Sequence, residues 1–173
     1  MSFGSAHAGT TDVTATITVG NGVTVTGSAE NDRISFGESS DITGGAGEDI
    51  FLIGLIFVNN SSAPRFITIA DLSASEDDSI DFGGILLLTA TTGTAVNLIA
   101  EADLGLAPDA AATFANYLNL ASNQTAGVLS GFEFAGNTYI VEDNNSAAAT
   151  FASATDCMVE LTGSVDLTEI AYA

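Results

Sequence analysis

Apolar and polar residues alternate along the first part of the chain, as they do in half-buried β-strands. Every second residue from Val13 to Val19 is apolar, and threonines fill the positions between them. Gly20-Asn21-Gly22 interrupts this run before a second apolar stretch begins at Val23. The pattern predicts either a β-hairpin or, equally, the first strands of a coil of parallel strands.

Further strands are predicted where apolar residues cluster between turn-forming residues. The segment Ile50–Val58 is almost continuously apolar, which predicts a fully buried strand. Other strands are expected around Phe66–Ile69, Ser79–Phe82 and Ile85–Leu98, and from Phe132 onward.

One α-helix is predicted, over Pro108–Ala121. Proline suits the first turn of a helix, because the N–H that it lacks would have no partner there. Phe114, Tyr117, Leu118 and Ala121 follow at spacings of three and four residues, so they share one face. We interpret this apolar face as part of the protein core.

A nonapeptide at residues 44–52 carries the strongest chemical signal in the chain. Its sequence, GGAGEDIFL, matches the pattern G-G-x-G-x-D-x-U-x, in which U is a large apolar residue. The glycines allow backbone angles that bring carbonyl oxygens close to a cation. Asp49 offers a charged oxygen of the kind that calcium prefers, and Phe51 is expected to point into the core.

Two degraded copies precede this nonapeptide. Residues 27–35 keep a glycine at the first position and Asp32 at the sixth, and residues 36–43 keep Asp41. Asp32, Asp41 and Asp49 are therefore spaced by nine and eight residues. Two nonapeptides make one full turn of a parallel β-roll, so Asp32 and Asp49 are expected on the same edge, with a cation between their turns. A glycine- and aspartate-rich loop without a metal is the alternative.

With these repeats the chain resembles the RTX family, whose members leave Gram-negative bacteria by type I secretion. Residues 67–82 resemble the segment that follows the repeats in that family, residues 132–143 resemble a hairpin near the C-terminus, and residues 159–167 resemble a closing strand. The pattern is most similar to the C-terminal regions of bacterial surface-layer proteins and large RTX adhesins. The chain departs from it in having one complete repeat, and in Leu72 where phenylalanine is usual.

The resemblance implies a fold class and a set of metal ligands. The expected fold is mainly β: a short parallel β-roll or β-solenoid with calcium-binding turns, closed by antiparallel strands and one α-helix. Residues 1–26 would form an N-terminal strand segment or hairpin, residues 27–58 the calcium-binding turns, and residues 59–173 a C-terminal β-rich region. The candidate calcium ligands are Gly27, Asn31, Asp32, Asp41, Gly44, Gly45, Gly47, Asp49, Asp71, Asp78 and Asp81.

The charge of the chain supports an extracellular protein that carries calcium. Twenty-two acidic residues face two basic ones, Arg33 and Arg65, for a net charge of −20. Like charges at close range cost free energy, which bound cations relieve. A solvated acidic surface, as in proteins from salty habitats, is the other interpretation, and the two are compatible. The same charge argues against nucleic-acid binding, since it would repel phosphates.

The ends of the chain predict export without a Sec signal peptide. The first nine residues contain neither a basic region nor an apolar one. The tail Glu169–Ala173 resembles the uncleaved C-terminal signal of type I substrates, so a type I exporter is an expected partner. The apolar runs are too short to span a bilayer as helices, and no membrane insertion is expected.

Catalytic motifs are not found in the sequence. It contains no G-x-S-x-G or H-E-x-x-H motif and only one histidine. The paired acids Asp77-Asp78 and Glu142-Asp143 lie in segments that the resemblance explains structurally, so we do not expect an enzyme. The single cysteine, Cys157, is predicted to be a buried thiol, with an intermolecular disulfide as the alternative.

The sequence therefore predicts a secreted calcium-binding structural protein. It would fold outside the cell, where calcium is available, and assemble with copies of itself into a surface layer, filament or matrix. The segment Asp12–Val25 would add a strand to the sheet of a neighbouring copy. Two alternatives stay open: a monomeric calcium-dependent adhesin or binding module, and the secretion domain of a larger RTX protein.

Overall fold

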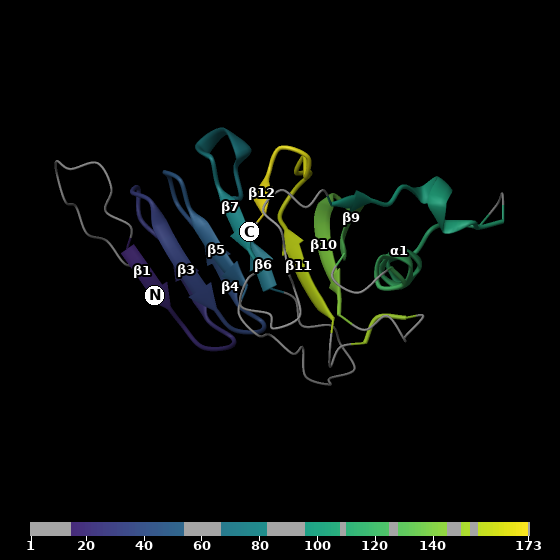
Figure 1. The fold of residues 1–173 in the computed structure, drawn as a ribbon, viewed down its shortest axis with the longest axis horizontal. Coiled ribbons are helices and arrows are strands. Elements are labelled where there is room, and N and C mark those ends of the chain that lie inside the picture. Colours follow the sequence, from purple (N-terminus) through teal and green to yellow (C-terminus); the bar gives the residue numbers. More distant parts are fainter. Residues whose placement is uncertain are drawn as a thin grey trace.

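The described part of the chain contains twelve β-strands, two short 3-10 helices and one α-helix. The computed structural model describes residues 15–53, 67–82, 96–107, 110–124, 128–144, 150–152 and 156–172. These residues are mainly β, and their strands form parallel and mixed sheets (Figure 1). No helix among them is long and apolar enough to cross a membrane.

Two sheets contain all of these strands. The five-stranded sheet is parallel throughout and has the order β1 (Ala15–Thr18), β3 (Asp32–Phe36), β5 (Ile50–Ile53), β7 (Ser79–Asp81), β12 (Ala171–Tyr172). The seven-stranded sheet is mixed and has the order β2 (Thr24–Thr26), β4 (Asp41–Thr43), β6 (Ile67–Ile69), β11 (Cys157–Leu161), β10 (Asn137–Asp143), β9 (Val128–Phe134), β8 (Asn97–Leu98).

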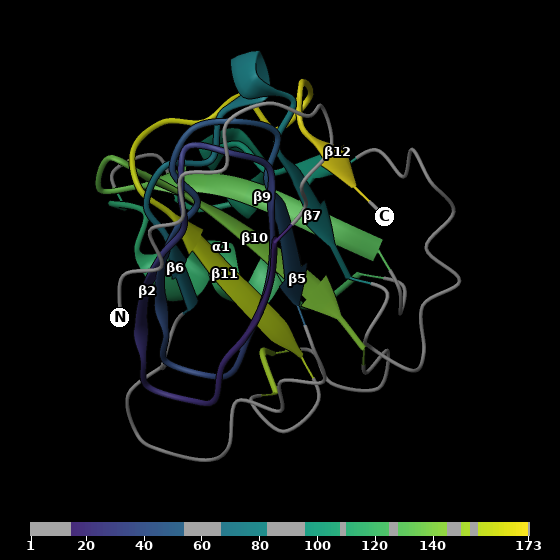
Figure 2. The same cartoon turned by 90° about the vertical axis from the view of Figure 1, so that its left-hand side faces the viewer.

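The chain alternates between the two sheets from β1 to β7. Within each sheet the successive strands pair in parallel, and the first pairings join residues 17 positions apart, as in Ala15 with Asp32, and Arg33 with Ile50. Figure 2 shows these strands lying one behind the other. The side chains that alternate along each strand therefore stack on those of the next strand in the same sheet.

The last two strands continue this alternation after an inserted segment. Strand β11 pairs in parallel with β6, and β12 pairs in parallel with β7. Between β7 and β11 the chain forms β8, the 3-10 helix η2 (Glu101–Leu104), the helix α1 (Phe114–Ala121), β9 and β10. Strands β9 and β10 are antiparallel around a turn at Ala135 and Gly136, whose φ angles are 52° and 87°, which confirms the predicted hairpin.

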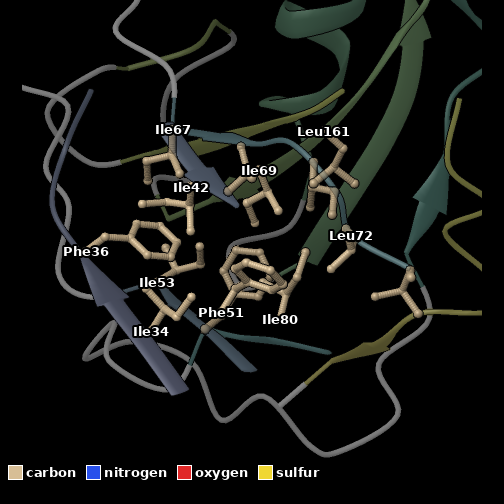
Figure 3. Packing of buried hydrophobic residues seen from close by; sticks show 14 of the residues in the cluster. Ile34, Phe36, Ile42, Phe51, Ile53, Ile67, Ile69, Leu72, Ile80 and Leu161 are labelled. Atoms are coloured by element: carbon tan, nitrogen blue, oxygen red, sulfur yellow. The ribbon is translucent and has the colours of Figure 1, made fainter. Parts of the chain in front are cut away.

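The main hydrophobic core lies between the two sheets. Ile34 and Phe36 of β3 and Phe51 and Ile53 of β5 are buried, and they point toward the isoleucines of β4 and β6 (Figure 3). Phe51 is 0% exposed, as expected for the large apolar residue of the nonapeptide. Cys157 is also buried in this core, in agreement with its prediction as a buried thiol.

A second, aromatic core joins α1 to the hairpin. Tyr117 stacks on Phe132 and Phe132 stacks on Tyr139, each with ring centroids 5.2 Å apart. Tyr117, Leu118 and Ala121 are the buried residues of the helix, so its predicted apolar face does pack into the protein.

The structure contradicts the hairpin interpretation of residues 12–26. Strands β1 and β2 lie in different sheets and do not pair with each other. Instead, β1 pairs with β3, and β2 pairs with β4. The backbone explains this placement, because Val19 N–H donates to the carbonyl of Ser35 rather than to a residue of β2. The second interpretation, the first strands of a parallel array, agrees with the observed pairing.

Two predicted boundaries also change. Strand β5 is half-buried rather than fully buried, because Ile50 and Leu52 face away from the core; residues 54–58 lie outside the described residues. The helix begins at Phe114, because Thr113 forms a capping box: its Oγ1 accepts the N–H of Asn116, whose side chain accepts the N–H of Thr113. Residues 110–113 are not helical, and residue 108 lies outside the described residues.

Candidate functional site

Two glycine-containing turns lie directly beside each other. Residues 27–31 join β2 to β3, which begins at Asp32, and residues 44–49 join β4 to β5. Because both pairs of strands are parallel and in register, the turns stack: Gly27 N–H donates to the carbonyl of Thr43 at 2.8 Å, and Ala46 N–H donates to the carbonyl of Ser28 at 3.1 Å. We call residues 27–32 and 44–49 the glycine turns.

Three aspartates form a row across this edge of the molecule. Asp32 N–H donates to Oδ1 of Asp49 at 2.8 Å, and Asp49 N–H donates to Oδ1 of Asp78 at 2.9 Å. The expected placement of Asp32 and Asp49 on one edge is therefore confirmed. Asp78 belongs to the turn before β7, where its Oδ2 also accepts the N–H of Ser73 at 2.9 Å. We call Asp32, Asp49 and Asp78 the carboxylate row.

Further side chains tie neighbouring turns together. The carboxylate of Asp71, which follows β6, accepts the N–H groups of Gly44 at 2.8 Å and Gly45 at 3.0 Å. The side-chain oxygen of Asn31 accepts the N–H of Glu48 at 3.0 Å. The second glycine turn is thus held by polar side chains from the turn before it and from the residues after β6.

Glycine is needed at these positions because atoms of the neighbouring turn lie where a Cβ would be, and not only because glycine is flexible. A Cβ on Gly27 would lie 2.0 Å from the carbonyl oxygen of Gly44 and 2.7 Å from Oδ2 of Asp32. Gly45 has a φ of 115°, and a Cβ there would lie 1.8 Å from the carbonyl oxygen of Ser28. Because these glycines have no side chain, oxygen atoms of the neighbouring turn can lie close to their Cα atoms.

One carboxylate oxygen in the row has no hydrogen-bond partner among the residues that the structure describes. Asp32 is 1% exposed, and its Oδ1 is unpaired, whereas its Oδ2 accepts the N–H and the hydroxyl of Ser28 at 2.7 and 3.0 Å. In Asp49 and Asp78 the equivalent Oδ1 atom accepts an N–H from the preceding turn. A buried, unpaired anionic oxygen is costly unless a cation or a donor satisfies it.

Burial and crowding act strongly on the same carboxylates. The pKa of Asp49 is raised from its usual 3.8 to about 7, mainly because the carboxyl is buried. The N–H of Asp32 lowers this pKa, and the nearby charges of Asp78, Asp32 and Asp71 raise it. Burial also raises the pKa of Asp78. The anionic forms of these groups therefore need a source of positive charge.

The other candidate ligands take different places. Gly47 has a φ of 106° and faces Asn31 across the stacked turns. Asp41 begins β4 in the other sheet, where its side chain is exposed. Asp81, at the end of β7, pairs with Arg33 at 3.2 Å. Asp41 and Asp81 are thus not members of the carboxylate row.

Two serines that sequence reasoning did not select take part in these turns. Ser28 donates two hydrogen bonds to Asp32, and Ser73 donates its N–H to Asp78. Ser73 precedes Asp78 by five residues, as Gly44 precedes Asp49. A search for a small residue five positions before an aspartate would have found the third turn.

The stability of the metal-free protein is expected to fall as the pH rises from about 4 to about 7. The raised pKa of Asp49 means that its contribution to stability is fully present below 3.8 and is lost as the pH passes through about 7. Urea unfolding in chelator across this range measures the effect. The variant Asp49→Asn has no proton to lose at this position and should show a flatter profile. An equally steep profile would contradict the assignment to Asp49.

The described residues contain no group of three or more histidine, cysteine, aspartate or glutamate side chains arranged to share one metal ion. No protein-family model and no curated protein matches the sequence of this chain. We therefore base the functional proposal on the geometry of the turns.

Proposed function

We propose that the chain is a calcium-dependent structural module of the β-roll type, which folds and assembles with copies of itself outside the cell. The observation that carries the proposal is the stacked pair of glycine turns, in which the buried Oδ1 of Asp32 has no partner among the described residues. The alternation of strands between two sheets, with parallel pairings 17 residues apart, supports the β-roll.

The residues of the glycine turns fit a calcium ion chemically. Calcium takes six to eight oxygen ligands, including backbone carbonyls, carboxylates and water. The carbonyl of Gly44 and Oδ2 of Asp32 both face the space beside Gly27, and Oδ2 of Asp49 faces the corresponding space beside Gly44. Asp32, Asp49 and the carbonyls of the turns would hold the ion. Its charge would offset the repulsion within the carboxylate row.

Calcium would act as a switch for folding after export. In a cytoplasm with little free calcium, repulsion in the carboxylate row disfavours the stacked turns, and the chain stays open for a type I exporter. Outside the cell, calcium binds the folded state and stabilises it by about 1.4 kcal/mol per site at ten times Kd. Extracellular modules bind calcium with Kd values of roughly 0.1 to 1 mM, which matches such a switch.

Urea unfolding in chelator and in millimolar calcium tests this proposal. We expect calcium to move the midpoint of the wild-type protein to higher urea. Asp49→Asn should lose most of this shift, and in chelator it should be more stable than the wild type, because it buries no charge. Asp41→Asn is the matched control, since Asp41 is exposed and outside the row; its shift should equal that of the wild type. Equal wild-type midpoints with and without calcium would refute the proposal.

Self-assembly is supported by the ends of the two sheets. Strands β1 and β2 are end strands of their sheets, and one side of each pairs with no strand of the described residues. An unpaired strand edge of this kind can accept a strand from another copy. Light scattering and electron microscopy in chelator, then in calcium, test this part of the proposal. We expect particles far above 17.4 kDa that appear only with calcium.

A monomeric binding module is the second candidate, and a cavity favours it. A hollow of about 560 Å³ lies between β8, β9 and residues 164–167. Apolar and acidic side chains line it, among them Leu98, Tyr117, Phe132, Glu101, Glu133 and Asp166. Cavities of this size hold small ligands in many proteins. A calcium-loaded protein that sediments as a monomer would favour this candidate over self-assembly.

A further inference from the structure

A second buried acidic site lies outside the glycine turns. Glu142 is in β10, and its neighbours across the sheet are Leu129 in β9 and Cys157 in β11, both part of the main core. Its side chain is 0% exposed, and neither of its carboxylate oxygens makes a hydrogen bond of normal geometry to another described residue. Nothing in the apolar surroundings of this strand pair explains a carboxyl group at this position.

Glu142 differs in this respect from the other buried carboxylates of the described residues. Each of the others accepts at least one backbone N–H: Asp32 from Ser28, Asp49 from Asp32, Asp78 from Asp49 and Ser73, Asp143 from Gln124, and Asp156 from Asn144 and Ala152. A carboxylate that is buried without donors is destabilising by several kcal/mol unless it is neutralised.

Two other oxygen-bearing side chains lie beside it. Asp156, which is 0% exposed and directly precedes Cys157, is close enough for its charge to raise the pKa of Glu142. The side-chain amide of Asn144 lies close enough to Glu142 to lower its pKa. Its oxygen and nitrogen are nevertheless buried and make no hydrogen bond of normal geometry within the described part of the chain. Arg33 is the one basic side chain among the described residues, and it pairs with Asp81. A protein cation is therefore not the counter-charge of Glu142 in this part of the chain.

We propose that Glu142, Asp156 and Asn144 form a second cation site, which takes calcium. All three offer hard oxygen atoms, the type of ligand that calcium prefers over softer nitrogen and sulfur. The two carboxylate oxygens of Glu142 and the amide oxygen of Asn144 would point to the ion, and the carboxylate of Asp156 would be the third protein group around it. The ion would join the end of β10 to the start of β11, so it would stabilise the sheet where the inserted segment rejoins the parallel strands.

The number of calcium ions bound by the full chain, measured by isothermal titration calorimetry, tests this site. Glu142→Gln keeps the size of the side chain and removes its charge, and it should bind about one calcium ion fewer than the wild type. Asn144→Ala should keep the number but weaken one of the affinities by about tenfold or more. Glu169→Gln, at an exposed position, is the matched control and should bind as the wild type does.

Each outcome decides for or against the site. A Glu142→Gln protein that binds as many calcium ions as the wild type overturns it. If Glu142→Gln does not fold, Asn144→Ala decides, and an unchanged set of affinities overturns the site. Asp49→Asn, titrated in parallel, tests the glycine turns alone and so keeps the two proposals apart. If Glu142→Gln binds fewer calcium ions than the wild type and Asp49→Asn binds as many, the result supports the site at Glu142 and refutes the site in the glycine turns.

Discussion

Replacing Gly45 by alanine is expected to lower the free energy of unfolding by about 3 kcal/mol or more. The φ of 115° is strained for any residue with a side chain, which alone costs on the order of 1 to 3 kcal/mol. The new Cβ would also lie 1.8 Å from the carbonyl oxygen of Ser28, a backbone atom of the stacked turn. The two glycine turns would have to separate, and the bond from Gly45 N–H to Asp71 would weaken.

Gly20→Ala is the control for this experiment. Gly20 also lies in a turn, but a Cβ there would meet nothing within 4 Å, and its φ is not in the left-handed region. We expect its free energy of unfolding to change by less than about 1 kcal/mol. Urea unfolding of both variants in millimolar calcium provides the comparison. Similar losses in the two variants would show that the stacking of the turns is not what the glycine at position 45 permits.

Phe51→Ala is expected to destabilise the protein by about 3 to 5 kcal/mol. Phe51 is 0% exposed and lies between the sheets, close to Ile80 and Ile69 (Figure 3). Because side chains of both sheets surround it, neither sheet can close the cavity without moving against the other. The shift of the urea midpoint caused by calcium should also become smaller, because Phe51 follows Asp49 by two residues and anchors the strand next to it.

Leu52→Ala is the internal comparison for Phe51. Leu52 is the next residue of β5, but it points away from the core and is only half-buried. Its truncation should cost about 1 kcal/mol. Urea unfolding at constant calcium concentration measures both variants. If Leu52→Ala costs as much as Phe51→Ala, the burial of alternate residues in β5 does not describe the protein in solution.

The parts of the fold that rest on short-range periodicity could be predicted from the sequence. The regular spacing of Asp32 and Asp49 places them on one edge because the strands that follow them, β3 and β5, are stacked neighbours. The hairpin around Gly136 is likewise local, and its turn needs a positive φ at two adjacent residues. In both cases the residues that determine the contact lie within one repeat or one turn of each other.

The remaining features depend on pairings that the sequence does not space regularly. Asp78 follows Asp49 by 29 residues instead of 17, so the repeat period does not place it in the carboxylate row. The burial of Glu142 depends on strands β9 and β11 on either side of it, and its sequence neighbours do not reveal that arrangement. The start of the helix at Phe114 depends on the side chains of Thr113 and Asn116, which compete with the proline signal upstream.

The inserted segment has a consequence for the order in which the sheets are completed. Strands β11 and β12 pair Val159 with Ile67 and Ala171 with Ser79, so both contacts join residues 92 positions apart. Loop-closure entropy makes such a contact about 1.5 kcal/mol less favourable than one across 17 residues. Until β11 and β12 have paired, the backbone groups along one edge of β6 and one edge of β7 therefore remain without their strand partners. At high concentration the strands that arrive can belong to another molecule, and this domain swap would link two copies through contacts that each copy already makes within itself.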